Sequence, residues 1–93
     1  MSKIIELNKE KNDSFISILK NNNKVNVWCD EETRIKITNE EFAYIINFSI
    51  NKLSVIKGYL IGEIIVESES FAVAVGFCVD EEDVLNIDRI SII

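Results

Sequence analysis

Histidine and proline are absent from this chain of 93 residues, and it contains only three glycines and two cysteines. Without histidine, neither a Ser–His nor a Cys–His nucleophilic pair can form, and imidazole-ligated zinc is excluded. Gly58, Gly62 and Gly76 are too far apart for a phosphate-binding loop or a dinucleotide-binding fingerprint. Two thiols cannot complete a four-thiolate zinc site. Only carboxylates, lysines, tyrosines and thiols remain for chemistry, and we expect neither an enzyme nor a bound cofactor.

The cysteines also bear on the compartment of the protein. Cys29 and Cys78 lie in apolar, strand-like runs, and small secreted domains usually contain more cysteine. We therefore expect reduced, buried thiols and a cytoplasmic location, with a single disulfide as the alternative. Residues 1–11 alternate charged and aliphatic side chains and show no signal-peptide core. The most apolar span, residues 42–66, is interrupted by asparagine, lysine and glutamate, so we expect no membrane span.

Charge is unevenly distributed along the chain, whose net charge is −6. Residues 1–24 hold five lysines and three acids, whereas residues 25–93 hold five basic residues and thirteen acids. Binding to nucleic-acid phosphates requires clustered lysine and arginine, and most of this chain has the opposite character. Direct binding to DNA or RNA is therefore not expected.

The first part of the chain contains the weaker structural signals. The apolar run Ile4–Leu7 predicts a first strand. Asn12–Ser14 offers N-cap side chains ahead of apolar residues at helical spacing, which predicts a short helix that ends at Asn21–Asn23. Apolar residues then alternate over 25–29 and again over 34–37, on either side of a polar turn at Asp30–Glu32, which predicts a β-hairpin.

The strongest local signal is a helix start. Thr38-Asn39-Glu40-Glu41 matches a capping box, and Ile37 and Phe42 occupy the two positions of a hydrophobic staple. Gly58 is placed as a C-terminal cap. These residues predict a helix over residues 39–57.

Three strands are predicted after this helix. They span residues 59–67, 71–79 and 86–93, with turns at Ser68–Ser70 and Asp80–Asp83. The expected order is β-α-β-β-α-β-β-β, with short connections. We therefore predict a single α+β domain over residues 1–93, with a mostly antiparallel sheet of five or six strands, one long helix and one short helix.

The long helix has more apolar surface than one face requires. Its core stripe, from a spacing of 100° per residue, contains Phe42, Ile45, Ile46, Leu53 and Ile56, with Ser49 inside it and Ile50 at its edge. A second stripe of Tyr44, Phe48 and Val55 lies roughly opposite, beside Asn51. Either the first helix or a terminus covers this second stripe, or it is an exposed aromatic patch that binds a partner.

The strand at 71–79 is apolar on both faces. Phe and Val occupy its odd positions, and Ala, Gly and Cys occupy its even positions. Such a strand is expected in the centre of a sheet with both faces covered. The second layer is either another helix of the chain or a second copy, which makes a homodimer one of the expected states.

Acidic residues are concentrated in the second half of the chain. Those that we consider for a partner-binding surface are Glu63, Glu67, Glu69, Asp80, Glu81, Glu82 and Asp83. Solubility alone accounts for a net charge of this size. The sharper interpretation is that these carboxylates imitate nucleic-acid phosphates and occupy a basic groove on another protein.

Three functional hypotheses follow. The first is a non-enzymatic inhibitor or regulator that binds a nucleic-acid-handling protein. Compact, acidic domains without catalytic residues and rich in Ile, Asn and Lys resemble in kind the anti-defence (anti-CRISPR-like) inhibitors that phages and mobile elements direct at host nucleases. The second is a self-associating, homodimeric accessory domain. The third is a metal enzyme that uses the acids at residues 30–32 and 80–83, although neither run has the spacing of a calcium-binding loop.

Overall fold

The computed structural model describes residues 13–20 and 23–93, and the strand predicted at Ile4–Leu7 lies outside them. The elements in these ranges are β1 (Asp13–Lys20), β2 (Asn23–Asp30), α1 (Glu31–Ile35), α2 (Asn39–Leu53), β3 (Leu60–Glu67), β4 (Ala72–Val79) and β5 (Leu85–Ile92). The predicted α+β class is confirmed, whereas the predicted order of elements is wrong in the first part of the chain.

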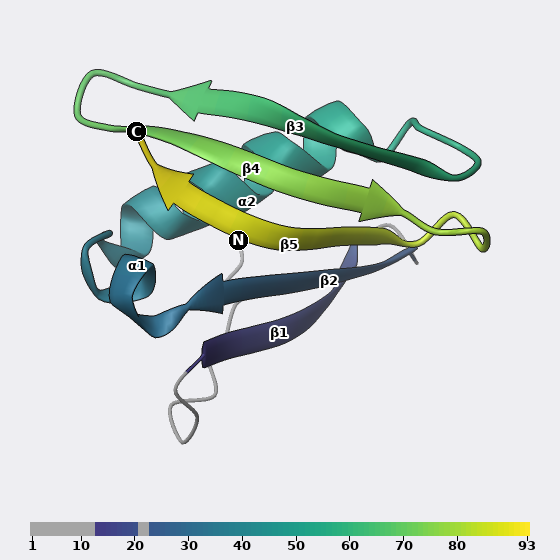
Figure 1. Cartoon of the computed structure of the whole chain (residues 1–93), viewed down its shortest axis with the longest axis horizontal. Coiled ribbons are helices and arrows are strands. Elements are labelled where there is room, and N and C mark those ends of the chain that lie inside the picture. Colours follow the sequence, from purple (N-terminus) through teal and green to yellow (C-terminus); the bar gives the residue numbers. More distant parts are fainter. Residues whose placement is uncertain (1–12, 21–22) are drawn as a thin grey trace.

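The strands form one mixed sheet in the order β1-β2-β5-β4-β3 (Figure 1). β1 and β2 form an antiparallel hairpin, and β3, β4 and β5 form an antiparallel meander. The two parts join where β5 pairs in parallel with β2, from Val25 opposite Leu85 to Val27 opposite Ile87. The strand that comes last in the sequence is therefore in the middle of the sheet.

Helix α2 begins at the predicted capping box. The Glu41 N–H donates to Thr38 Oγ1 and the Thr38 N–H donates to Glu41 Oε1, both at 3.0 Å. Ile37 and Phe42, the two staple residues, are both buried. The helix ends at Leu53, four residues earlier than predicted, because the chain turns there and Ile56 packs back against the core. Gly58 has a positive φ of 89°, but it lies in the loop after the helix.

One face of the sheet packs against α2 (Figure 1). The helix contributes the predicted core stripe, and its buried residues are Phe42, Ile45, Ile46, Ser49, Ile50 and Leu53. The strands contribute alternate residues, and those that are buried are Val25, Val27, Cys29, Val66, Val73, Val75, Phe77, Val79, Leu85, Ile87 and Ile90. The buried Ser49 hydroxyl donates to the carbonyl of Ile45 at 2.8 Å, which satisfies the hydroxyl group within the helix.

The segment predicted as the short helix is strand β1. Its apolar residues fit a helical spacing, but β1 pairs along its whole length with β2, and this pairing decides the conformation. The predicted polar turn at Asp30–Glu32 is also wrong. Asp30 is the N-cap of α1, since its carboxylate accepts from the Thr33 N–H at 3.2 Å. The strand predicted over 34–37 does not form, because Arg34 and Ile35 belong to α1 and the buried Ile37 lies in the connection to α2.

Arg34 links the two helices. Its guanidinium donates to the carbonyl of Ile37 at 3.0 Å and to Asn39 Oδ1, and it lies 4.3 Å from the centre of the Phe42 ring. Partial burial lowers the pKa of Arg34, an effect that the nearby Cys29 opposes. The guanidinium remains charged at neutral pH.

The two cysteines lie on opposite faces of the sheet, and β5 separates their strands. Cys29 is buried under the helices, and Cys78 is half-buried on the other face, so no disulfide joins them. Among the helices of the described residues, none is both long enough and apolar enough to cross a membrane.

Candidate protein-binding surface

Strand β3 forms one edge of the sheet, and no described segment pairs with its outer side. Hydrogen-bonded and non-hydrogen-bonded pairs alternate along antiparallel strands. Ala72 accepts a hydrogen bond from the Ile93 N–H, on the β5 side, so Glu67 opposite Ala72 belongs to a non-hydrogen-bonded pair. Because the backbone groups of every second residue point the same way, the N–H and C=O groups that face away from β4 are those of Ile61, Glu63, Ile65 and Glu67.

The exposed edge of β3 is apolar. Tyr59 and Ile61 are both 63 % exposed, Ile65 is 51 % exposed and Leu60 is 43 % exposed. Natural edge strands are usually protected by charged side chains, especially lysine, or by proline, bulges or short length. β3 runs for eight residues without lysine or proline. Its unpaired backbone and its exposed isoleucines are features of a strand that accepts another strand, and its charged residues are both acidic.

Acidic side chains alternate with the isoleucines of this edge. Glu63 and Glu67 lie on the same face of β3 as Ile61 and Ile65, the face away from α2. Glu69 is exposed in the turn that follows. Within the described residues no side chain bonds to the Glu67 carboxylate.

Glu63 forms the ion pair of this surface. Arg89 of β5 reaches across β4 to it, with 2.6 Å between Nη2 and Oε2. The guanidinium lies over Gly76, where a Cβ atom would be 3.1 Å from Arg89 Cζ. Glycine at this position therefore makes room for the ion pair. Since both partners are about half-exposed, the pair contributes only about 0.2–1 kcal/mol to stability.

Aromatic residues border β3 on its other face. Tyr44 of α2 contacts the ring of Phe71 edge-on, with 5.8 Å between ring centres, and lies 6.1 Å from Phe48. Phe48 and Phe71 are partly buried against the core, together with Ile64 of β3. The predicted second stripe of α2 is thus partly accounted for by packing, because Phe48 is partly buried whereas Tyr44 and Val55 are exposed.

We define the β3 edge surface as Tyr44, Phe48, Ile61, Glu63, Ile65, Glu67, Glu69 and Phe71. The turn after β3 is tied to the start of α2, since the Ser70 hydroxyl donates to Glu41 Oε2 at 3.3 Å. The aromatic residues of the surface lie on the α2 side of β3, whereas its isoleucines and the glutamates of β3 lie on the face away from α2. Five of the residues predicted from the sequence for partner binding lie in this surface.

The other predicted residues lie elsewhere. Asn51 is exposed on α2, and Val55 is 75 % exposed just beyond its end. The Asp80–Asp83 turn joins β4 to β5 at the end of β4 opposite to Glu69, on the order of 25 Å away for a strand of this length. The structure therefore separates the predicted carboxylates into two groups.

Two carboxylates of the Asp80–Asp83 turn stabilise the fold by accepting backbone hydrogen bonds. Asp80 Oδ1 accepts from the N–H groups of Glu82 at 2.8 Å and Val84 at 3.0 Å. These hydrogen bonds lower the pKa of Asp80 below its usual value. Asp83 has a left-handed backbone, with φ of 66°, and its carboxylate accepts from the Gly58 N–H at 2.7 Å. Glu81 and Glu82 are exposed.

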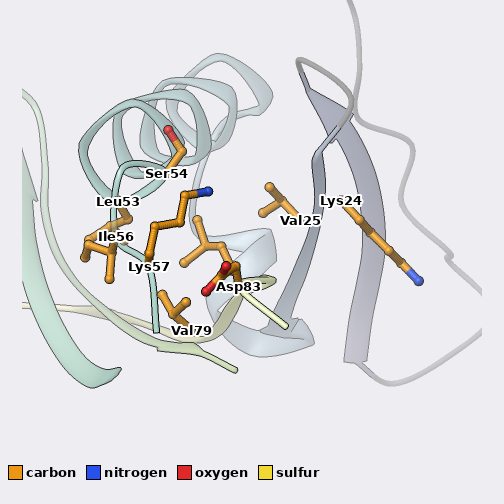
Figure 2. A pocket seen from close by; sticks show the side chains of 9 residues that line it. Lys24, Val25, Leu53, Ser54, Ile56, Lys57, Val79 and Asp83 are labelled. Carbon is orange, nitrogen blue, oxygen red and sulfur yellow. The ribbon is translucent and has the colours of Figure 1, made fainter. Parts of the chain in front are cut away.

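A small pocket lies beside this turn (Figure 2). Its lining includes Lys24, Lys57 and Asp83, and its free volume is about that of one water molecule. A pocket of this size does not hold a substrate. Residues 13–20 and 23–93 contain no group of three or more acidic or cysteine side chains placed to hold a metal ion.

The open face of the sheet, which is the face away from α2, carries the half-buried Trp28 and a row of polar side chains. The Ser17 hydroxyl donates to Asn26 Oδ1 at 2.7 Å, and the Asn26 amide donates to Asn86 Oδ1 at 2.9 Å. Asn86 in turn donates to the carbonyl of Cys78 at 3.3 Å. This row of cross-strand bonds leads to Ile61, which lies opposite Cys78. Polar and apolar side chains therefore occur together across the open face.

The sequence places Ile61 and Ile65 on one face of β3 with Glu63 and Glu67, but it did not predict that these isoleucines are exposed. The alternation of isoleucine and glutamate in this strand was visible, but the order of strands was not. Only that order makes β3 an edge and leaves Ile61 and Ile65 in contact with solvent. Comparisons of the chain with models of protein families, with curated proteins and with solved structures find no match.

Proposed function

We propose that the protein is a non-enzymatic inhibitor or regulator that binds another protein through the β3 edge surface. The observation that carries this proposal is the pair of exposed isoleucines, Ile61 and Ile65, on a strand whose backbone edge is unpaired within the described residues. Core packing does not require either side chain. Exposed apolar groups with a polar rim are typical of interaction sites.

The acids of the surface indicate a basic partner. Glu67 and Glu69 add negative charge beside the apolar groups, and the whole chain has a net charge of −6. Complementary charge speeds association and fixes the orientation of two proteins. A nucleic-acid-handling protein, with its basic groove, fits this requirement. We therefore retain the anti-defence type of inhibitor as the proposed class.

The energies involved require several of these residues to act together. Burying one aliphatic side chain completely stabilises a complex by about 1.5–3 kcal/mol, and Ile61 and Ile65 are already partly covered. Association costs about 4–15 kcal/mol in lost freedom of motion. The aromatic group around Tyr44 and the charged residues must therefore contribute as well.

The test is an affinity pull-down from nuclease-treated bacterial lysate with the tagged protein, followed by mass spectrometry. We expect one stoichiometric partner on the wild-type protein and its loss with Ile65→Glu. Ile35→Glu is the matched control, because Ile35 is 75 % exposed on α1 and lies outside the β3 edge surface. Loss of the partner with both variants, or retention with both, would contradict the proposal.

A second candidate is a self-associating domain, and the same apolar edge favours it. Light scattering at high micromolar concentration separates the two. The mass of one chain is expected for the inhibitor. The mass of two chains, returning to one with Ile65→Glu, would establish the homodimer instead.

A further inference from the structure

We infer that the β3 edge binds an extended segment of a partner protein as an added strand, and that this segment alternates basic and apolar residues along one face. This inference rests on the proposed function and specifies its binding mode. Such strand addition obtains affinity from main-chain hydrogen bonds and specificity from alternate side chains.

The backbone geometry supplies the first argument. The outward-facing N–H and C=O groups of β3 belong to Ile61, Glu63, Ile65 and Glu67. The side chains of the same four residues lie on the open face of the sheet. An incoming strand therefore forms backbone hydrogen bonds with the same residues whose side chains it contacts on the open face.

The side-chain pattern supplies the second argument. Along the open face, isoleucine and glutamate alternate from Ile61 to Glu67. Directly opposite side chains on paired strands contact each other, and opposite charges stabilise the pair. Partner residues opposite Glu63 and Glu67 are therefore lysine or arginine, and those opposite Ile61 and Ile65 are apolar. β3 has no basic residue of its own, and Arg89 approaches Glu63 from the β4 side.

The side chains of β4 next to this edge are small. Ala74 lies opposite Ile65, and Ala72 lies opposite Glu67. Both are small and half-buried on the open face. Because these two side chains are small, they leave Ile65 and Glu67 uncovered on the β4 side.

A second copy of this chain fits the edge less well. In a two-fold antiparallel pairing of β3 with itself, the outward-facing residues must pair with one another. If Glu63 meets its own copy or Glu67, like charges are opposed, and if it meets Ile61 or Ile65, a carboxylate faces an aliphatic group. No such register provides a cation, and each copy has a net charge of −6.

The inference is tested with blocked eight-residue peptides added to the ¹⁵N-labelled protein. The first peptide alternates threonine with lysine, valine, lysine and valine. The second has glutamate in place of lysine, and the third has the composition of the first with its lysines adjacent. We expect the first to shift the amide signals of Ile61, Glu63, Ile65 and Glu67, and to bind at least tenfold more tightly than either control. Added salt at 0.5 M should weaken it.

Two variants make the test decisive. Ile65→Pro removes an outward-facing N–H without breaking a bond to β4, and we expect it to abolish binding of the lysine peptide. Glu67→Lys keeps the backbone unchanged, and we expect it to reduce or reverse the preference for lysine over glutamate. Equal affinity for the first two peptides, shifts confined to other strands, or pairing of β3 with a second copy would overturn the inference.

The outcomes also separate this inference from the proposed function. If a partner is captured by the wild-type protein and is retained by Ile65→Pro and Glu67→Lys, the binding mode is wrong and the proposed function stands. If no partner is captured but the lysine peptide binds as expected, the edge has the inferred preference and the inhibitor proposal fails.

Discussion

The two faces of β4 are both apolar, but one carries large side chains and the other carries small ones. Val73, Val75, Phe77 and Val79 face α2 and are at most 5 % exposed, whereas Ala72, Ala74 and Cys78 on the open face are half-buried. On β3 the contrast is larger, since Val66 is fully buried and Ile65 beside it is 51 % exposed. Large side chains under the helix are explained by the core. Large side chains on the open edge are not, and this difference identifies the candidate surface.

The largest effect expected from this comparison is in the free energy of unfolding. Ile46→Ala empties space in the core and should lower it by about 2–5 kcal/mol, because Ile46 has no exposed surface. Ile65→Ala removes the same atoms from the open face and should lower it by only about 1 kcal/mol, because half of the side chain is exposed. Urea denaturation of both variants measures the difference. Similar losses would mean that Ile65 belongs to the core.

A smaller effect on the free energy of unfolding is expected at Gly62 and Gly76. A Cβ atom at Gly62 would be 3.0 Å from the ring of Phe77, which is buried under α2. Gly62→Val should therefore lower the free energy of unfolding by about 1–3 kcal/mol, and Phe77→Leu in the same chain should recover part of the loss. At Gly76 the nearest group is the half-exposed guanidinium of Arg89, so Gly76→Ala should cost less than Gly62→Val. Thermal melting compares the variants.

The smallest effect is expected at the Asp80–Asp83 turn and depends on pH. Backbone hydrogen bonds lower the pKa of Asp80, so its carboxylate stabilises the fold above the unfolded pKa of about 3.9 and loses this effect as pH falls through the folded pKa. Asp80→Asn should lower the melting temperature at pH 7, and the gap to the wild type should narrow below about pH 4. Glu81→Gln, at an exposed neighbour, is the control. A gap that is constant with pH would contradict the assignment.

Local signals in the sequence predicted the second half of the fold well. The capping box joins Thr38 and Glu41, which are three residues apart in the sequence, and it forms as expected. The alternation of residues in β3 and β4, with a short turn between them, also specified their pairing. The buried stripe of α2 followed from its spacing, including Ser49.

The first part of the fold was missed, partly because it depends on distant residues and partly because one local signal was overlooked. The segment of β1 suits a helix or a strand by itself, and only its pairing with β2 decides between them. α1 was overlooked although Asp30, followed by two glutamates and Thr33, has the features of a helix start. The candidate surface was predicted in part, because Tyr44 and the acids could be seen in the sequence, whereas the exposure of Ile61 depends on the order of strands.

The central position of β5 has a consequence for how the protein is made. Synthesis releases the N-terminal parts first, so the segments of β1 and β2 are made before the residues of β5 that hold them to the rest of the sheet. Asn26 and Asn86, whose side chains bond across β2 and β5, are sixty residues apart. Such long-range pairing slows folding, and until β5 is synthesised the nascent chain exposes both the edge of β2 and the edge of β4. The interval before β5 appears is therefore the period in which this chain is most exposed to aggregation and to proteolysis.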